Sequence, residues 1–427
     1  MSVLKSLPEL LQAEVITPET ADKIRDYYNS KESSSVNRLF IVFGILGAIL
    51  VGLGIILIIA HNWDEFSRTV KVVFAFLPLL AGQVLCGYSL IKQPDSTAWK
   101  EASTAFLFFA VGASISLVSQ IYNIPGNLSS FLMTWMLLCL PLVYVMKSSV
   151  TSLLYIIGIT YFACETNYWS YPSTESYWYW LMFAGVLPHY YYLYGKQPDS
   201  NFMVMHNWIF PVSLIIALGT VAKNTDELMF IAYMSLFGVF YLVGMSGYFR
   251  QQKTRNNSFR VLGSAGTLIL LLILSFDGFW EDLRSRNLLL NEIILAPEFY
   301  ASVVLSLAAA GLFYINFKKE RIKANEPFAF IFMLFIVTFI IGGVLPFAVV
   351  LINLYVLTIG ILTIMDGAKK FHLGILNYGL LIITALVVCR FFDTDLSFVM
   401  RGILFVSVGA GFFATNYWML KKRKTNE

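Results

Sequence analysis

The chain has 427 residues, of which 58% are hydrophobic and 13% charged, and its mean hydropathy is +0.70. So few charges cannot cover a water-soluble globule of this size, so the surplus apolar surface is expected to face lipid. The net charge of +4 comes from basic residues that are spread among loops and form no patch, so no nucleic-acid partner is expected. Because the apolar runs are long and continuous, the sequence predicts an all-α polytopic integral membrane protein, not a β-barrel.

Residues 1–34 are predicted to form a short cytosolic helical hairpin followed by a serine-rich flexible linker. Leucines at positions 4, 7, 10 and 11 predict an amphipathic first helix. A second helix is expected to begin at Thr17-Pro18-Glu19, with an N-cap, a proline at the first helical position and an acid in the first turn. Such a head either docks a protein partner or shields the first loop, and both interpretations stay open.

Residues 35–427 are predicted to form the transmembrane domain, with about 14 helices and a range of 12–14. The lower bound allows for two weaker regions, 208–222 and the closely spaced pair in 327–365. The predicted spans are 39–60, 72–91, 102–122, 128–146, 149–165, 177–194, 208–222, 228–248, 259–277, 298–317, 327–343, 347–365, 373–389 and 397–420.

Lysines and arginines alternate in density from loop to loop, which predicts the orientation of the chain. With an even number of spans and a cytoplasmic N-terminus, most of the 30 basic residues lie inside, including the C-terminal run Lys421–Lys424. The sequence therefore predicts a bacterial cytoplasmic (inner) membrane protein with both termini in the cytoplasm.

One pentapeptide, KQPDS, occurs twice, at 92–96 and at 196–200, each time just after an apolar span. A shift by the same interval places the first four spans roughly on the next four. The spacing favours parallel four-helix repeats, over 39–146, 149–248 and 259–365, followed by a final pair in 373–420. Chance recurrence in a biased alphabet is the alternative, and the sequence leaves both open.

The first span is rich in glycine and ends in the polar sequence IIAHNWDEF at 58–66, and a second block ends in SLVSQIYNIPG at 116–126. With Trp135 in the following span, this combination resembles an uncharacterised bacterial family of predicted membrane proteins (domain of unknown function 2157). The resemblance covers roughly residues 4–146. It implies a cytosolic head followed by membrane spans, and it implies no activity.

The two polar blocks predict an outward-facing pocket, because both lie at the outer ends of spans. Its candidate substrate-binding residues are His61, Asn62, Trp63, Asp64, Gln120, Tyr122 and Asn123. Their alternative role is to end helices in the headgroup zone, where Trp63 suits the aromatic belt. Intramembrane amides are expensive unless paired, so Gln83, Gln120, Asn353 and Asn377 are expected to make hydrogen bonds between helices.

Arg390 and Arg401 flank two acids in the predicted outer loop CRFFDTDLSFVMR. They either neutralise those acids or join the pocket and hold a lipid phosphate. Membrane lipids are therefore the expected ligand class.

No catalytic motif or metal-ligand spacing is present, so no cofactor and no metal is expected, and nothing identifies an enzyme. The first functional hypothesis is a protein that handles a lipid or small solute, as a secondary transporter or flippase does. The second is a non-catalytic scaffold or sensor acting through its head. The third is a lipid-linked sugar or phosphate transferase that uses Asp64 and Glu65.

Overall fold

The computed structural model describes residues 3–13, 15–26, 63–169, 175–223, 225–253, 256–286, 290–322, 326–391 and 397–399, and short stretches up to residue 417. Within these residues every regular element is a helix, which confirms the predicted all-α class. The chain divides into two compact units, Met1–Leu77 and Pro78–Glu427, which are described separately. The predicted boundary between head and transmembrane domain falls at residues 34–35, outside the described residues.

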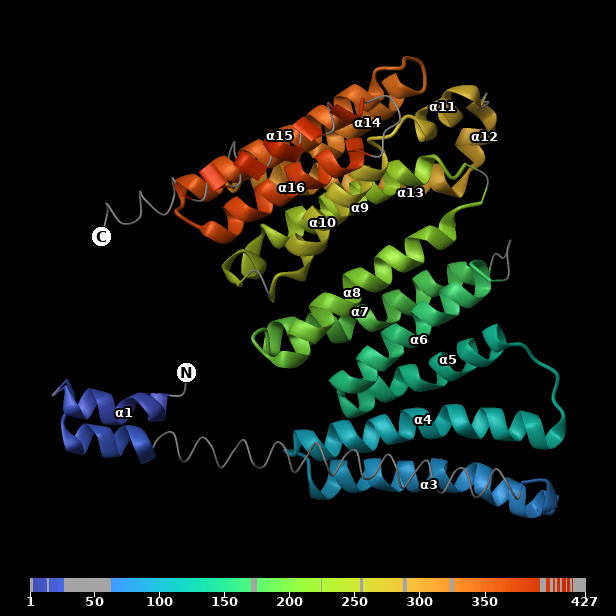
Figure 1. The fold of residues 1–427 in the computed structure, drawn as a ribbon. Helices are drawn as coiled ribbons and strands as arrows, with labels where there is room; N and C mark the ends of the chain where they lie inside the picture. Colours follow the sequence, from blue (N-terminus) through green and yellow to red (C-terminus); the bar gives the residue numbers. More distant parts are fainter. Residues whose placement is uncertain are drawn as a thin grey trace. The chain divides into compact units, whose positions relative to one another are not determined.

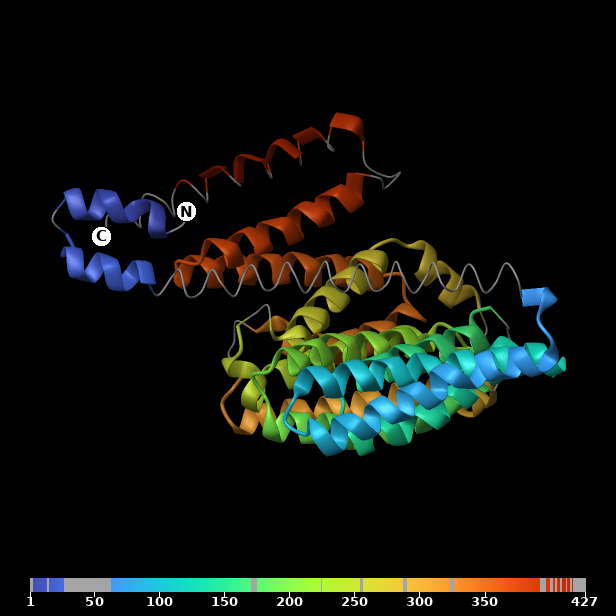
Figure 2. The same cartoon turned by 90° about the horizontal axis from the view of Figure 1, so that it is seen from below.

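The second unit is a bundle of helices laid side by side (Figure 1), and α15 and α16 form one closely packed pair within it (Figure 2). Helix α3, Arg68–Lys92, leads into this unit. The helices that follow are α4 Thr97–Tyr122, α5 Leu128–Met146, α6 Ser149–Asn167, α7 Trp178–Lys196, α8 Asn201–Leu218, α9 Leu228–Gly244, α10 Ser258–Ile273, α11 Gly278–Ser285, α12 Leu290–Leu295, α13 Pro297–Lys318, α14 Ile331–Gly342, α15 Ala348–Lys369 and α16 Leu373–Phe391. Short 3-10 turns occur at η2 Glu175–Tyr177, η3 Gly219–Val221, η4 Gly247–Gln251 and η6 Pro327–Ala329.

Several helices begin at a polar residue whose side chain accepts a backbone N–H of the first turn. This arrangement satisfies one of the donors that a helix start leaves open. The capping residues are Ser96, Asn127, Ser148, Ser200 and Asn257. Local sequence thus determines where α4, α5, α6, α8 and α10 begin.

Among the described residues, eight helices are long and apolar enough to cross a membrane, and a ninth crossing results if α10 and α11 form one bent span. Helices α9 and α14 are apolar but shorter. Each predicted span from 72–91 to 373–389 falls on a helix. The span at 39–60 lies outside the described residues and 397–420 is described only in part, so the count of 14 stays a prediction.

In the first unit, α1 covers Val3–Gln12 and residues 18–26 are also helical. The Thr17 hydroxyl accepts the N–H of Thr20 at 3.3 Å, the contact expected of an N-cap. The packing of the two helices as a hairpin stays a prediction.

The repeated KQPDS pentapeptide forms the same local structure twice. It closes α3 and opens α4 at the first site, and it closes α7 and opens α8 at the second. At both sites the serine N–H donates to the glutamine carbonyl, at 3.1 Å and 3.2 Å. Equal sequences therefore form equal turns, while the four-helix repeat stays a prediction.

The close packing of α9 against α10 depends on glycine. A Cβ on Gly263 would lie 2.5 Å from the Tyr241 nitrogen and 2.7 Å from the Phe237 carbonyl oxygen. Gly244 makes the reciprocal approach, 2.6 Å from the Arg260 nitrogen. Small residues let backbones approach closely in membrane proteins, where helix association depends on packing.

Buried polar groups in the second unit are mostly paired. The carboxylate of Glu101, on α4, accepts the N–H groups of Ser149 and Val150 at 3.0 Å and 2.9 Å and so caps the first turn of α6. Asn353 donates across helices to the Ser275 carbonyl at 3.2 Å, as predicted.

The same prediction is wrong for the other three amides. The residues Gln83, Gln120 and Asn377 are exposed on the helix surface, and among the described residues no hydrogen bond joins their side chains to a neighbouring helix. Hydrophobic periodicity alone does not reveal which of these amides face a neighbouring helix.

Candidate functional site

The predicted pocket of polar residues is only partly described. His61, Asn62 and Arg401 lie outside the described residues. Trp63 and Asp64 belong to the 3-10 turn η1, Trp63–Glu65, in the first unit, where Lys71 lies 5.6 Å from the centre of the Trp63 ring. Gln120, Tyr122 and Asn123 belong to the second unit, so a pocket that joins the two sets stays a prediction.

The C-terminal end of α4 is a helix terminus of ordinary geometry. Asn123 has φ 51° and ψ 43°, and its N–H bonds to the carbonyls of Ser119 and Gln120. Asparagine tolerates this left-handed conformation, which explains its place at the C-cap. The Tyr122 side chain is half exposed. Helix α4 packs on α5 and α6, whereas Arg390 lies on α16, which packs on α15 and α10.

Arg390 contacts the connection between helices α10 and α11. Helices α10 and α11 are separated by four residues and meet at 73°. The Ser275 carbonyl at this break accepts Nη2 of Arg390 at 2.7 Å and Nδ2 of Asn353 at 3.2 Å. Trp280 donates its ring N–H to the Leu274 carbonyl at 2.9 Å. The Leu274 and Ser275 carbonyls of this connection thus have side-chain donors, as buried backbone carbonyls require.

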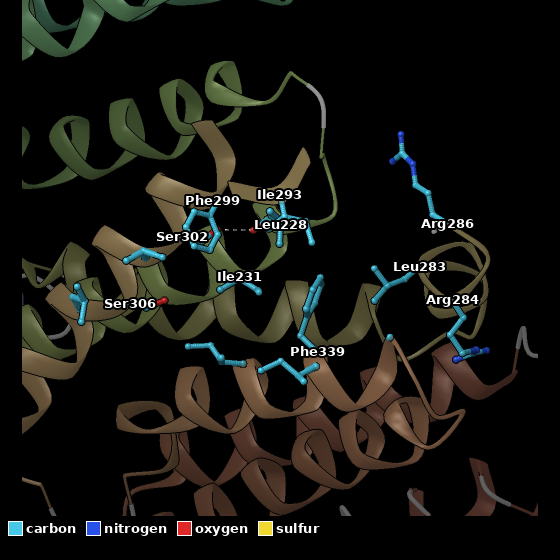
Figure 3. A pocket seen from close by; sticks show the side chains of 15 residues that line it. Leu228, Ile231, Leu283, Arg284, Arg286, Ile293, Phe299, Ser302, Ser306 and Phe339 are labelled. Atoms are coloured by element: carbon cyan, nitrogen blue, oxygen red, sulfur yellow. Dashed lines mark hydrogen bonds between the residues drawn. The ribbon is translucent and has the colours of Figure 1, made fainter. Parts of the chain in front are cut away.

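Helix α11 and its neighbouring helices line a cavity of about 880 Å³ (Figure 3). Apolar side chains dominate its surface. The lining comprises Leu228 and Ile231 of α9; Leu283 and Arg284 of α11, with Arg286 just after it; Ile293 of α12; Phe299, Ser302, Val303, Ser306 and Leu307 of α13; and Ile336, Phe339 and Ile340 of α14, with Gly343 just after it. A volume in this range suits a small ligand or part of a lipid.

The two serines in the cavity wall hold the helices together. The Ser302 hydroxyl donates to the Leu228 carbonyl at 2.8 Å, and the Ser306 and Ser235 hydroxyls lie 2.8 Å apart. Both contacts join α13 to α9. The interior of the cavity therefore offers shape and apolar contact rather than free polar groups.

Charge is concentrated at the α11 end of the cavity. Arg286 pairs with Glu227, and this hydrogen bond raises the pKa of the Arg286 guanidinium. Arg284 lies 3.4 Å from the carboxylate of Asp277. The two arginines extend from α11 in different directions (Figure 3), so they do not form one clamp.

Sequence reasoning missed this cavity. The one local signal is the Asp277-Gly278 pair, a turn signal at the end of the predicted span 259–277. That signal marks the α10–α11 break. The other walls come from helices distant in sequence, which no local pattern joins.

Among the described residues, no group of three or more His, Cys, Asp or Glu side chains is arranged to hold a metal ion. The four cysteines are free thiols, and two of them, Cys86 and Cys139, are buried.

Several long apolar helices joined by interhelical polar contacts define a helical membrane protein. Residues 8–152 match a family model described as "Predicted membrane protein (DUF2157)", which confirms the resemblance predicted for roughly residues 4–146. No curated protein and no solved structure matches the chain.

Proposed function

We propose that this membrane protein binds a lipid in the cavity beside the α10–α11 break and that handling of this lipid is its activity. The observation that carries the proposal is the apolar cavity of about 880 Å³ with charged residues at one end. Such a combination matches the two parts of a lipid molecule, an acyl chain and a headgroup.

The exposure of the lining residues supports a lipid rather than a water-soluble ligand. Leu307 is 68% exposed and Ile340 is 66% exposed, so the cavity opens sideways along α13 and α14. An acyl chain can enter by this route from the bilayer. Since bulk lipid is as apolar as the cavity wall, selectivity must come from shape and from the polar end.

The broken span supports handling over a purely structural lipid. In secondary transporters, discontinuous helices place ligand sites beside unwound backbone. Here α11 forms one wall of the cavity, and a movement of α11 about the Ser275 break would change the shape of the site.

A tryptophan in the cavity wall tests this function. We expect Val303→Trp, on α13, to obstruct part of the cavity and to lower the amount of lipid retained on the purified full-length protein by about tenfold, or roughly 1.4 kcal/mol. Native mass spectrometry measures the retained lipid. Val388→Trp is the matched control, because Val388 is exposed to a similar extent, 36% against 39%, and does not line the cavity. If both variants retain the same amount of lipid, the proposed function is wrong.

We further propose that the α11 end of the second unit faces outward and that both chain termini lie in the cytoplasm. If successive helices run in opposite directions, the helix ends and loops on the side opposite to α11 are rich in basic residues. These residues are Lys92, Lys147, Lys196, Arg250, Lys253, Lys318, Lys319, Lys369 and Lys370. Cytoplasmic loops are enriched in such residues.

Labelling from outside the cell checks this orientation. We expect Ser285→Cys, at the exposed end of α11, to react with a membrane-impermeant maleimide in intact cells. Gln251→Cys, in η4, should react only after permeabilisation. The unmodified chain gives the background from its native cysteines. The reverse pattern would show that the orientation is wrong.

A further inference from the structure

We infer that the lipid in this cavity carries a protonated primary amine and that Glu227 receives it. This inference rests on the proposed function and specifies its ligand class. A phosphoethanolamine group has the required chemistry, and it occurs both in phosphatidylethanolamine and as a free headgroup.

Glu227 has one carboxylate oxygen in use and one without a donor. The residue directly precedes Leu228, which lines the cavity, and it is only 9% exposed. Its Oε1 accepts from Arg286, which also lines the cavity. Its Oε2 is buried, and no described residue donates to it. A buried carboxylate oxygen normally has a hydrogen-bond partner, so a ligand N–H is the chemistry that completes this site.

The surroundings of this carboxylate favour a cation. The negative charges of Asp226 and Glu292, like that of Glu227, favour the charged form of Arg286. Close by, Glu298 accepts the backbone N–H groups of Lys223 and Thr225. Carboxylates thus outnumber basic side chains at this edge, and the local potential attracts positive charge.

The basic side chains nearby do not offset this preference for a cation. The Lys223 ammonium lies 4.5 Å from the centre of the Tyr177 ring. Arg284 is paired with Asp277 and extends away from Arg286 (Figure 3). A phosphate approaching Arg286 would meet the three neighbouring carboxylates, so a purely anionic headgroup is disfavoured. A quaternary ammonium has the charge but no N–H for Oε2.

A headgroup series separates these chemistries. The full-length protein is placed in nanodiscs, and native mass spectrometry compares phosphatidylethanolamine, phosphatidylcholine and phosphatidylglycerol with identical acyl chains. We expect phosphatidylethanolamine to bind about tenfold better than the other two, as one charge-assisted hydrogen bond predicts. Competition by free phosphoethanolamine reports whether the headgroup suffices. Strong competition assigns the ligand as a free headgroup, and weak competition assigns it as the lipid.

Two variants test the role of Glu227. We expect Glu227→Gln to lose the preference for the amine, while Glu281→Gln, an acid in the first turn of α11 outside the cavity lining, keeps it. Arg286→Gln should strengthen amine binding, because it removes the competing cation, whereas recognition of a phosphate by Arg286 requires the opposite change.

The outcomes distinguish this inference from the proposed function. A preference for phosphatidylglycerol, or a preference for the amine that survives in Glu227→Gln, overturns the inference and leaves lipid binding intact. Equal retention of every lipid in wild type and in Val303→Trp overturns the proposed function as well.

Discussion

Replacement of Gly263 by valine is expected to destabilise the second unit by about 3 kcal/mol or more, because the new side chain has no room. The Cβ alone would lie 2.5 Å from the Tyr241 nitrogen and 2.9 Å from its Cα, both backbone atoms of α9. Backbone cannot rotate aside as a side chain can, so α10 must separate from α9. Thermal unfolding of the detergent-solubilised protein measures the effect.

Gly311→Val is the matched control. Gly311 lies inside α13, and no atom stands within 4 Å of the position that its Cβ would take. We expect the free energy of unfolding to change by no more than about 0.5 kcal/mol, as for other surface substitutions. If both variants melt at the same temperature, close helix contact at Gly263 is not what stabilises the bundle.

Replacement of Arg390 by methionine is expected to destabilise the protein by about 2–3 kcal/mol, the range for hydrogen bonds of charged groups. Arg390 donates to the Ser275 carbonyl and to its hydroxyl, at 2.7 Å and 3.2 Å, and lies 4.7 Å from the Phe276 ring centre. Methionine keeps an unbranched chain and removes these donors. The freed break should then open more often, because Asn353 alone would hold the Ser275 carbonyl.

Hydrogen exchange locates this effect. We expect faster exchange of backbone amides in 276–285 in Arg390→Met, together with weaker lipid retention, since α11 forms one wall of the cavity. Arg250→Met, at an exposed site in η4, serves as the control and should change neither. Arg390→Lys should recover only part of the stability, because a single ammonium does not reproduce the planar guanidinium. Unchanged exchange in 276–285 would show that Arg390 does not hold the break.

Prediction from sequence succeeded where the signal was local. Apolar runs predicted each described helix from α3 to α16 that is long enough to span a membrane. The motifs IIAHNWDEF at 58–66 and SLVSQIYNIPG at 116–126 together predicted the family match. Asn353 was predicted to bond between helices and does so. Each of these depends on residues near one another in the chain, or on the high cost of an unpaired amide in lipid.

Prediction failed where the outcome depends on which helix faces which. Gln83 and Asn377 lie on exposed faces, although their sequence context resembles that of Asn353. Arg390 was predicted either to neutralise the acids beside it or to join a lipid-binding pocket, and both stay predictions. Its contacts with Ser275 were not predicted, because the two residues lie 115 positions apart in the chain. Glu227, the residue before α9, lies 59 positions from its partner Arg286 in the chain, so their pairing has no signature in sequence.

The amino-acid sequence by itself determined the class of this protein, the places where capped helices begin and the identical turns of its two KQPDS segments, because hydrophobicity and capping act over a few residues. Only the tertiary structure decided that α10 and α11 meet at 73° across Ser275, that residues from five helices line an apolar cavity and that Glu227, next to the cavity-lining Leu228, is buried. These features arise from contacts between distant helices, where close packing and the pairing of buried polar groups select one arrangement among many with the same hydrophobic pattern.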